Sequence, residues 1–72
     1  MSKVVIIVEG GNIQSVTSSE PLEVVIVDRD TDGVDLDELK TIDEEEAYVY
    51  QGITKSAVVP DYVKRVYAEA GR

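Results

Sequence analysis

The first third of the chain carries the strongest hydrophobic pattern. Val4–Val8 contains only apolar residues, and Leu22–Val27 contains a single acid, so both β-branched runs favour strands. Between them, Asn12–Ser18 is polar apart from Ile13 and Val16. Their spacing of three residues breaks strict alternation and suggests a β-bulge. The pattern predicts three strands in an antiparallel meander, with the polar strand in the centre.

Turn signals separate these strands. Gly10 and Gly11, followed by Asn12, tolerate positive φ and predict a tight hairpin turn. Pro21 cannot donate a hydrogen bond to a neighbouring strand, so it is expected at or before the start of the third strand. Both connections are short, which favours antiparallel pairing of successive strands.

The second half of the chain predicts shorter elements and one clear helix. Asp35–Lys40 fits one helical turn, with Asp35 as the N-cap and Glu38 completing a capping box. Ala47–Gln51 alternates in the manner of a fourth strand. Pro60–Ala70 predicts a helix, because proline suits the first turn and a glycine follows the last. The apolar stripe of this helix consists of Tyr62, Val63, Val66, Tyr67 and Ala70.

The composition supports a sheet-dominated fold. Valine and isoleucine supply 19 of the 72 residues, leucine supplies three, and Phe and Trp are absent. We expect the α+β class: a small antiparallel sheet of three to four strands, a β-meander, with the C-terminal helix packed on it. The length allows one domain, covering residues 1–72. Residues 53–59 fit either a loop or a short strand.

The net charge of −8 is concentrated in the middle of the chain. Residues 28–46 carry ten acids against Arg29 and Lys40. This argues against direct binding to nucleic acid or to an anionic membrane, both of which need clustered basic residues. A basic protein partner, a metal cation or simple solvation of an acidic loop would fit the charge. The expected acidic surface comprises Asp35, Asp37, Glu38, Asp43, Glu44, Glu45 and Glu46.

The residue types argue against catalysis. Histidine and cysteine are absent, which removes the usual general base, the thiol nucleophile and the commonest metal ligands. Gly10–Gly11 lacks the spacing of a phosphate-binding loop, and adjacent acids are more often solvated than held in a cleft. We therefore expect no enzymatic activity, no catalytic residue and no cofactor.

One acidic stretch resembles half of a calcium loop. Asp28, Asp30 and Asp32 alternate and are followed by Gly33, as in the first half of an EF-hand. The position of the bidentate glutamate is occupied by Leu39, and a strand rather than a helix precedes the loop. The three aspartates are weak candidates, and no metal site is expected.

The distribution of apolar residues also bears on location and assembly. No apolar run approaches the ~20 residues of a membrane span, and the N-terminus lacks the pattern of a signal peptide, so a cytoplasmic protein is expected. One short helix covers one sheet face, which leaves aliphatic side chains on the other face for a second copy. Residues 41–59 could instead fold back over that face. The expected homodimer interface comprises Val5, Ile7, Val25, Val27, Tyr48 and Tyr50.

Three short motifs carry a resemblance. They are Val8-Glu9-Gly10-Gly11, the pair Gln14-x-Val16, and the Val-rich strand that ends in Asp28-x-Asp30-x-Asp32-Gly33. In type and order this pattern resembles small uncharacterised bacterial proteins carried near phage and plasmid genes. The resemblance implies an accessory protein of bacteria or mobile elements and no activity.

Taken together, the sequence predicts a small non-enzymatic binding or interaction module that acts as a homo-oligomer. Two alternatives remain open. One is an acidic inhibitor that imitates nucleic acid and occupies the basic groove of a DNA-handling protein, which would use carboxylates such as those of Asp28, Asp30 and Asp32 at extended-chain spacing. The other is a small-molecule sponge with a pocket at the subunit interface.

Overall fold

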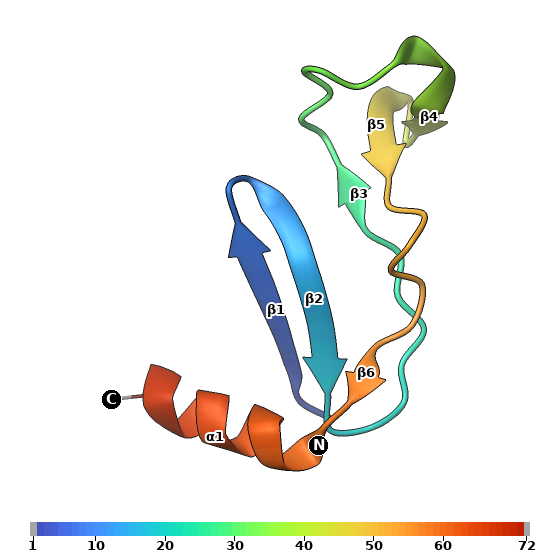
Figure 1. The fold of residues 1–72 in the computed structure, drawn as a ribbon. Helices are drawn as coiled ribbons and strands as arrows, with labels where there is room; N and C mark the ends of the chain where they lie inside the picture. The colour runs from blue at the N-terminus through green and yellow to red at the C-terminus, as the bar shows by residue number, and fades with distance from the viewer. Residues whose placement is uncertain (1, 72) are drawn as a thin grey trace. The chain divides into compact units, whose positions relative to one another are not determined.

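The computed structural model describes residues 2–71 and has the α+β class predicted from the sequence. Contacts within the chain form two compact units (Figure 1). Unit 1 comprises residues 2–24 and 55–71 of the described chain, and unit 2 comprises residues 25–54. The single domain predicted for residues 1–72 stays a prediction, because compact units can still unfold together.

Unit 1 begins with the predicted hairpin. Strand β1 (Val4–Glu9) pairs antiparallel with strand β2 (Asn12–Ser18), and the turn between them places Gly10 and Gly11 at φ 60° and 80°. The register shifts after Ile7, so that Gln14 is the extra residue on β2. The turn and the bulge are therefore confirmed.

The third strand of the unit 1 sheet is not the predicted one. Strand β6 (Ala57–Val58) pairs parallel with β2, which gives a mixed sheet in the order β1-β2-β6. The predicted strand Leu22–Val27 contributes only an isolated bridge between Glu23 and Lys55 in this unit. An extended apolar run can pair its backbone N–H and C=O groups with any extended segment that lies beside it. Here that segment comes from the far end of the chain.

A buried serine explains this local arrangement. Ser18 is fully buried at the end of β2. Its hydroxyl donates to the carbonyl of Glu20, and its Oγ lies 2.6 Å from Ser56 Oγ, within hydrogen-bond distance. Ser56 Oγ in turn accepts from the backbone N–H of Leu22 at 3.0 Å. A buried hydroxyl needs such partners, and these bonds hold the chain segments on either side of unit 2 together.

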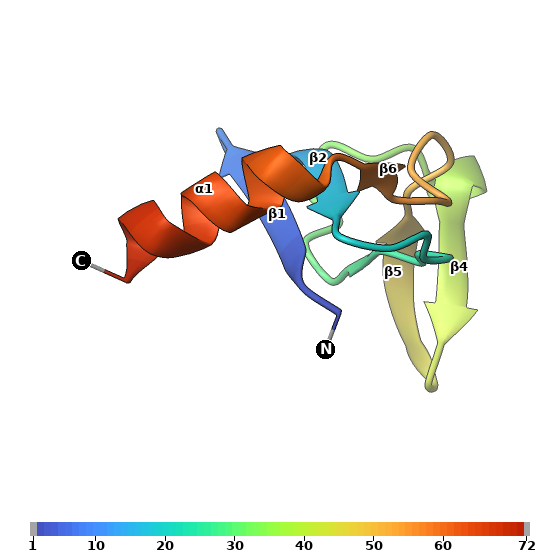
Figure 2. The same cartoon turned by 90° about the horizontal axis from the view of Figure 1, so that it is seen from below.

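Helix α1 (Pro60–Ala70) has the predicted bounds and contacts both strands of the hairpin. It runs across the end of the hairpin where β1 begins and β2 ends (Figure 1, Figure 2). Val63 of α1 is buried, as are Val5 of β1 and Val16 of β2, whereas Val66 is only half-buried. The helix therefore packs through Val63 first.

Unit 2 is an antiparallel sheet in the order β3-β5-β4. Its strands are β3 (Val27–Asp28), β4 (Leu39–Ile42) and β5 (Glu45–Val49), and a 3₁₀ turn at Leu36–Glu38 precedes β4. The sequence predicted β5 and the helical turn, although the Asp35 side chain makes no capping hydrogen bond. Strand β4 was not predicted.

The connection between β4 and β5 lacks the usual turn residues. Asp43 and Glu44 occupy its centre with φ of 54° and 68°, a conformation that favours glycine or asparagine. This is why the sequence pattern did not reveal the hairpin.

None of the helices within residues 2–71 combines the length and the apolar character needed to cross a membrane.

Candidate interaction surface on strand β1

Strand β1 is the edge strand of unit 1, and its backbone faces two ways. The carbonyl of Lys3 accepts a hydrogen bond from Ser19 N–H at 3.0 Å, so Lys3 faces β2. Val4 faces the other way, because its N–H and its carbonyl both bind the hydroxyl of Tyr67, each at 3.2 Å. The backbone N–H and C=O groups alternate in direction along a strand. Those of Ile6 and Val8 therefore also point away from β2.

The outward positions of β1 are apolar and exposed. Ile6 is 54% exposed and Val8 is 60% exposed. Within the described sheet, β2 is the one neighbour of β1. We name the β1 edge the outward backbone groups of Ile6 and Val8 together with their exposed side chains, which stand on one face of the sheet. An apolar edge strand without a partner is a surface to which another strand can add.

A hollow adjoins the β1 edge where the strand meets α1. It has a volume of about 400 Å³, and its lining is mostly apolar, from Val4, Val5, Val66, Tyr67, Ala70 and Gly71. The Lys3 ammonium lies 5.1 Å from the centre of the Tyr67 ring, in cation–π geometry. Tyr67 thus ties the start of β1 to the helix through its hydroxyl and its ring.

The structure corrects the predicted assignment of faces on β1. Val5, expected at the interface, is only 7% exposed and lines the hollow beside α1, and Ile7 is half-buried. The exposed residues are Ile6 and Val8 instead. Both faces of β1 are apolar in sequence, so the pattern could not show which face the helix would cover.

The other four predicted interface residues lie in unit 2. Val25 is 72% exposed, and Val27 is half-buried in β3. The rings of Tyr48 and Tyr50 meet edge to face with their centres 5.3 Å apart, and both residues are half-buried. Among these four residues, Val25 therefore offers the most exposed side chain.

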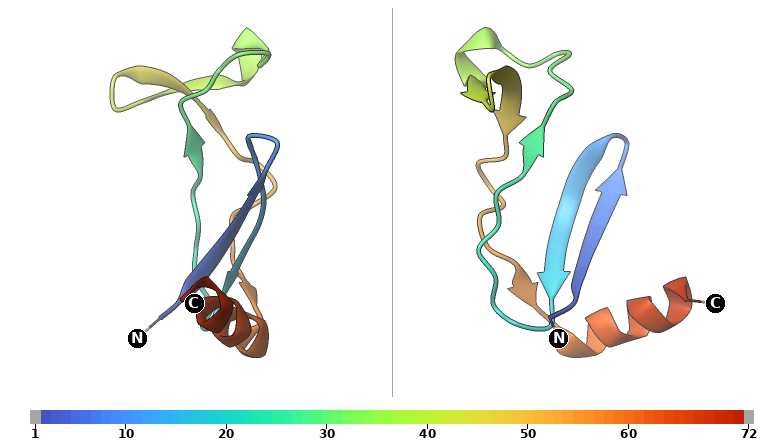
Figure 3. Two further views of the ribbon diagram at one scale, coloured as in Figure 1. Left: turned by 90° about the vertical axis from the view of Figure 1, so that its left-hand side faces the viewer. Right: turned by 180° about the vertical axis from the view of Figure 1, so that it is seen from behind.

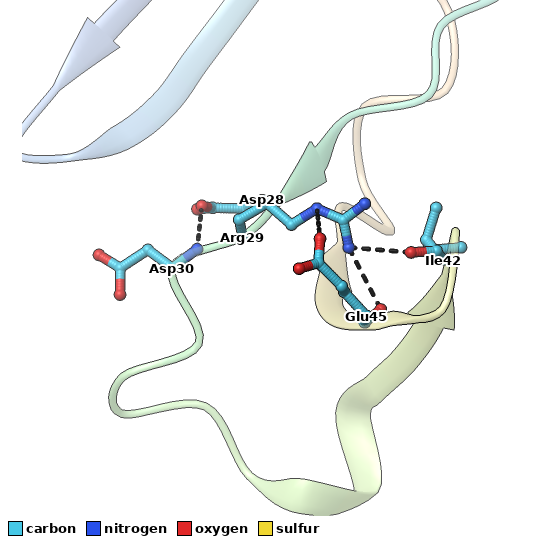
Figure 4. Close-up of polar contacts among 5 residues, drawn as sticks. All are labelled: Asp28, Arg29, Asp30, Ile42 and Glu45. Atoms are coloured by element: carbon cyan, nitrogen blue, oxygen red, sulfur yellow. Dashed lines mark hydrogen bonds and ion pairs between the residues drawn. The ribbon is translucent and has the colours of Figure 1, made fainter.

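The aspartates of the calcium-like loop bind their own backbone. Asp28 Oδ1 accepts from the N–H of Asp30 at 2.9 Å (Figure 4). Asp30 Oδ1 accepts from the N–H of Asp32 at 3.2 Å. These are successive Asx turns, which build a compact loop. No three acidic side chains within residues 2–71 gather as metal ligands. The phosphate-like spacing considered for these aspartates stays a prediction.

Arg29 performs a structural role that the sequence did not predict. Its guanidinium donates to the carbonyls of Ile42 and Glu45 at 2.9 and 3.2 Å, and its Nε lies 3.8 Å from the Glu45 carboxylate (Figure 4). The side chain therefore ties the end of β3 to the hairpin of β4 and β5. The sequence contained one indication of this role, namely a single arginine among the aspartates of the loop.

All seven predicted acidic surface residues are exposed and lie in unit 2. By sequence, residues 1–24 and 55–72 carry five basic and five acidic side chains, whereas residues 25–54 carry two basic and ten acidic ones. The net charge of −8 thus belongs entirely to unit 2. Unit 1, which holds the β1 edge, is neutral.

Comparison with known proteins adds no relative: no protein-family model matches the chain, and neither a curated protein nor a solved structure matches it.

Proposed function

We propose that this protein is a non-enzymatic interaction module that works as a homo-oligomer and meets its second copy through the β1 edge. The observation that carries the proposal is the pair Ile6 and Val8, exposed on a strand whose outer side has no neighbouring strand in the described chain. Soluble monomers usually protect such an edge with a charge, a proline or a covering segment.

Burial of these two side chains gives a modest driving force. Full burial of an aliphatic side chain stabilises by roughly 1.5–3 kcal/mol. Since Ile6 and Val8 are each a little over half exposed, roughly half of that gain remains for a partner to supply. A stable interface buries about 800 Å² per partner, which two side chains do not reach. The module is therefore a weak, concentration-dependent oligomer.

Charge does not oppose this association. Repulsion between like charges falls off over about 8 Å at physiological ionic strength. Copies that meet through the neutral unit 1 bring together equal numbers of basic and acidic side chains. Copies that met through unit 2 would bring together two strongly acidic surfaces.

The test is the mass of the chain in solution, measured by light scattering from about 10 μM to about 1 mM, where small interfaces dissociate. The wild-type mass should rise above that of one chain with concentration, and Ile6→Lys and Val8→Lys should each prevent the rise. Leu36→Lys is the matched control, because Leu36 is an 81% exposed aliphatic residue of unit 2. A one-chain mass for the wild type at every concentration would contradict the proposal.

The proposed setting is the bacterial cytoplasm, as an accessory protein of a phage or plasmid. It rests on the pattern that runs from Val8 through the Asp28–Gly33 loop. The genes beside the coding sequence test it: phage or plasmid genes are expected there, and housekeeping genes in several hosts would contradict it.

A second candidate function is an acidic inhibitor that binds a basic groove on a DNA-handling protein. The observation in its favour is the concentration of ten exposed or half-buried acids in unit 2. Retention of the chain by a basic nuclease column should then weaken steeply between low and high salt, because exposed charges are screened. Retention that does not change with salt, or no retention at low salt, would contradict this candidate.

A further inference from the structure

The β1 edge offers a defined set of hydrogen-bonding groups. Val4 is capped by the Tyr67 hydroxyl, which both accepts from its N–H and donates to its carbonyl. Beyond Val4, the strand presents one outward donor and one outward acceptor at Ile6 and again at Val8. An added strand therefore has two open residues to bind, two positions apart.

We infer that a second copy of this chain adds its own β1 antiparallel to the β1 edge, with the two-fold axis passing through Ile7. The inference rests on the proposed homo-oligomer and specifies how its copies meet. Ile6 of one copy exchanges N–H···O bonds with Val8 of the other, and the symmetry repeats this pair on the opposite side of the axis. The two mixed sheets of unit 1 then join into one continuous sheet.

The Tyr67 cap disfavours a register shifted toward the start of β1. With the axis at Ile7, the paired residues are the two open ones, and Val4 keeps both bonds to Tyr67. With the axis at Ile6 instead, Val4 would have to pair with Val8 of the second copy, and the hydroxyl would lose both bonds. That register therefore exchanges two existing hydrogen bonds for new ones and gains less than the register with its axis at Ile7.

The surroundings of Val4 fit the same register. The C-terminal half of α1 extends past β1 on its open side, so an added strand must pass close to it (Figure 1, Figure 3). The axis at Ile7 places Gly10 of the second copy opposite Val4. Gly10 of the second copy has no side chain that could collide with the Tyr67 ring. Within its own chain, no atom lies within 4 Å of the position that a Cβ of Gly10 would occupy.

Charge favours a second copy over an unrelated strand. Lys3 and Glu9 lie at the two ends of β1, on the same face. In the antiparallel pair, Lys3 of one copy is the diagonal neighbour of Glu9 of the other, within reach for long side chains. The sequence of the strand is thus self-complementary at both ends of the contact, and a neutral unit 1 adds no repulsion.

Single cysteines test the register, because the chain contains no cysteine of its own. Facing residues in a non-hydrogen-bonded antiparallel pair have Cα atoms about 4.5 Å apart, which a disulfide can bridge. Ile7→Cys should therefore form a covalent dimer on mild oxidation, read from mass on a non-reducing gel. Ile6→Cys and Val8→Cys should each cross-link slowly alone, because diagonal Cα atoms lie beyond about 7 Å.

A mixture supplies the second readout. Ile6→Cys mixed with Val8→Cys should give the heterodimer, since these residues face each other in the inferred register. Circular dichroism of each variant confirms that it has folded, and light scattering of the wild type runs in parallel.

The outcomes separate the inference from the proposed function. Rapid cross-linking of Ile6→Cys alone would move the axis and overturn the register. A two-chain mass without cross-linking at Ile7 or in the mixture would overturn the inference and leave the homo-oligomer standing. A one-chain mass throughout, without cross-linking, would overturn both and leave a strand of a different protein as the occupant of the edge.

Discussion

The two units of the chain are stabilised in different ways. Unit 1 contains four of the five buried residues in the described chain, namely Val5, Val16, Ser18 and Val63, and it is neutral. Unit 2 contains one, Ala47, and carries the whole net charge of −8. Burial of aliphatic side chains holds the first unit, whereas backbone pairing and Arg29 hold the second. Like charges repel, so the proposed contact between copies lies in the neutral unit 1 rather than in the acidic unit 2.

The largest effect is expected where unit 1 buries its helix. Val63→Asp places an unpaired charge in the core, which costs more than about 4 kcal/mol and should unfold the unit. Lys64→Ala, on the exposed neighbour, should leave the melting temperature within a few degrees. Thermal denaturation followed by circular dichroism compares them. Equal melting of both variants would show that α1 does not pack through Val63.

A smaller effect is expected at Arg29, the side chain that ties the end of β3 to the β4–β5 hairpin of unit 2. Arg29→Met removes the donors to Ile42 and Glu45 and should lower the stability of the β4–β5 hairpin by about 1 kcal/mol. Amide hydrogen exchange should speed up in β4 and β5 and stay unchanged in β1 and β2. Lys40→Met is the matched control, and equal acceleration by both variants would contradict the anchoring role.

One substitution in the β4–β5 turn should stabilise unit 2. Glu44 has φ of 68°, so Glu44→Gly should relieve backbone strain and stabilise the hairpin by about 0.5–1 kcal/mol. Glu46→Gly, in the extended strand β5, should instead destabilise it by a similar amount. Urea denaturation gives both values, and the same sign for both variants would refute the strain argument.

The smallest effect concerns calcium. The Asp28–Gly33 loop uses two of its carboxylates to accept backbone N–H groups, so we expect no tight calcium binding. Isothermal titration calorimetry at near-physiological ionic strength should give only heats of dilution. A dissociation constant of about 10 μM or below, the range of calcium sensors, would contradict this expectation.

The sequence predicted the elements that rest on local signals. Gly10 and Gly11 specified the hairpin turn, the Ile13–Val16 spacing indicated the bulge, and Pro60 with Gly71 bounded the helix. Each of these signals acts within a few residues along the chain. Such local signals predict these elements without knowledge of the tertiary structure.

The sequence did not predict the pairings that depend on distant partners. Leu22–Val27 has the composition of a strand, but β6, which comes from residues 57–58, takes the place beside β2. The assignment of faces on β1 failed for a related reason. Both faces are apolar, so the pattern could not show that Val5 lies buried beside Val66 and Tyr67 of α1 while Ile6 stays exposed.

A concentration series of amide chemical shifts by NMR tests most directly whether copies meet through the β1 edge of unit 1. Between about 20 μM and about 1 mM, the range in which a small interface dissociates, the amides of Ile6 and Val8 should show the largest shifts. Those of β4 and β5 should remain constant. Shifts that are independent of concentration, or that are largest in β4 and β5, would contradict the account.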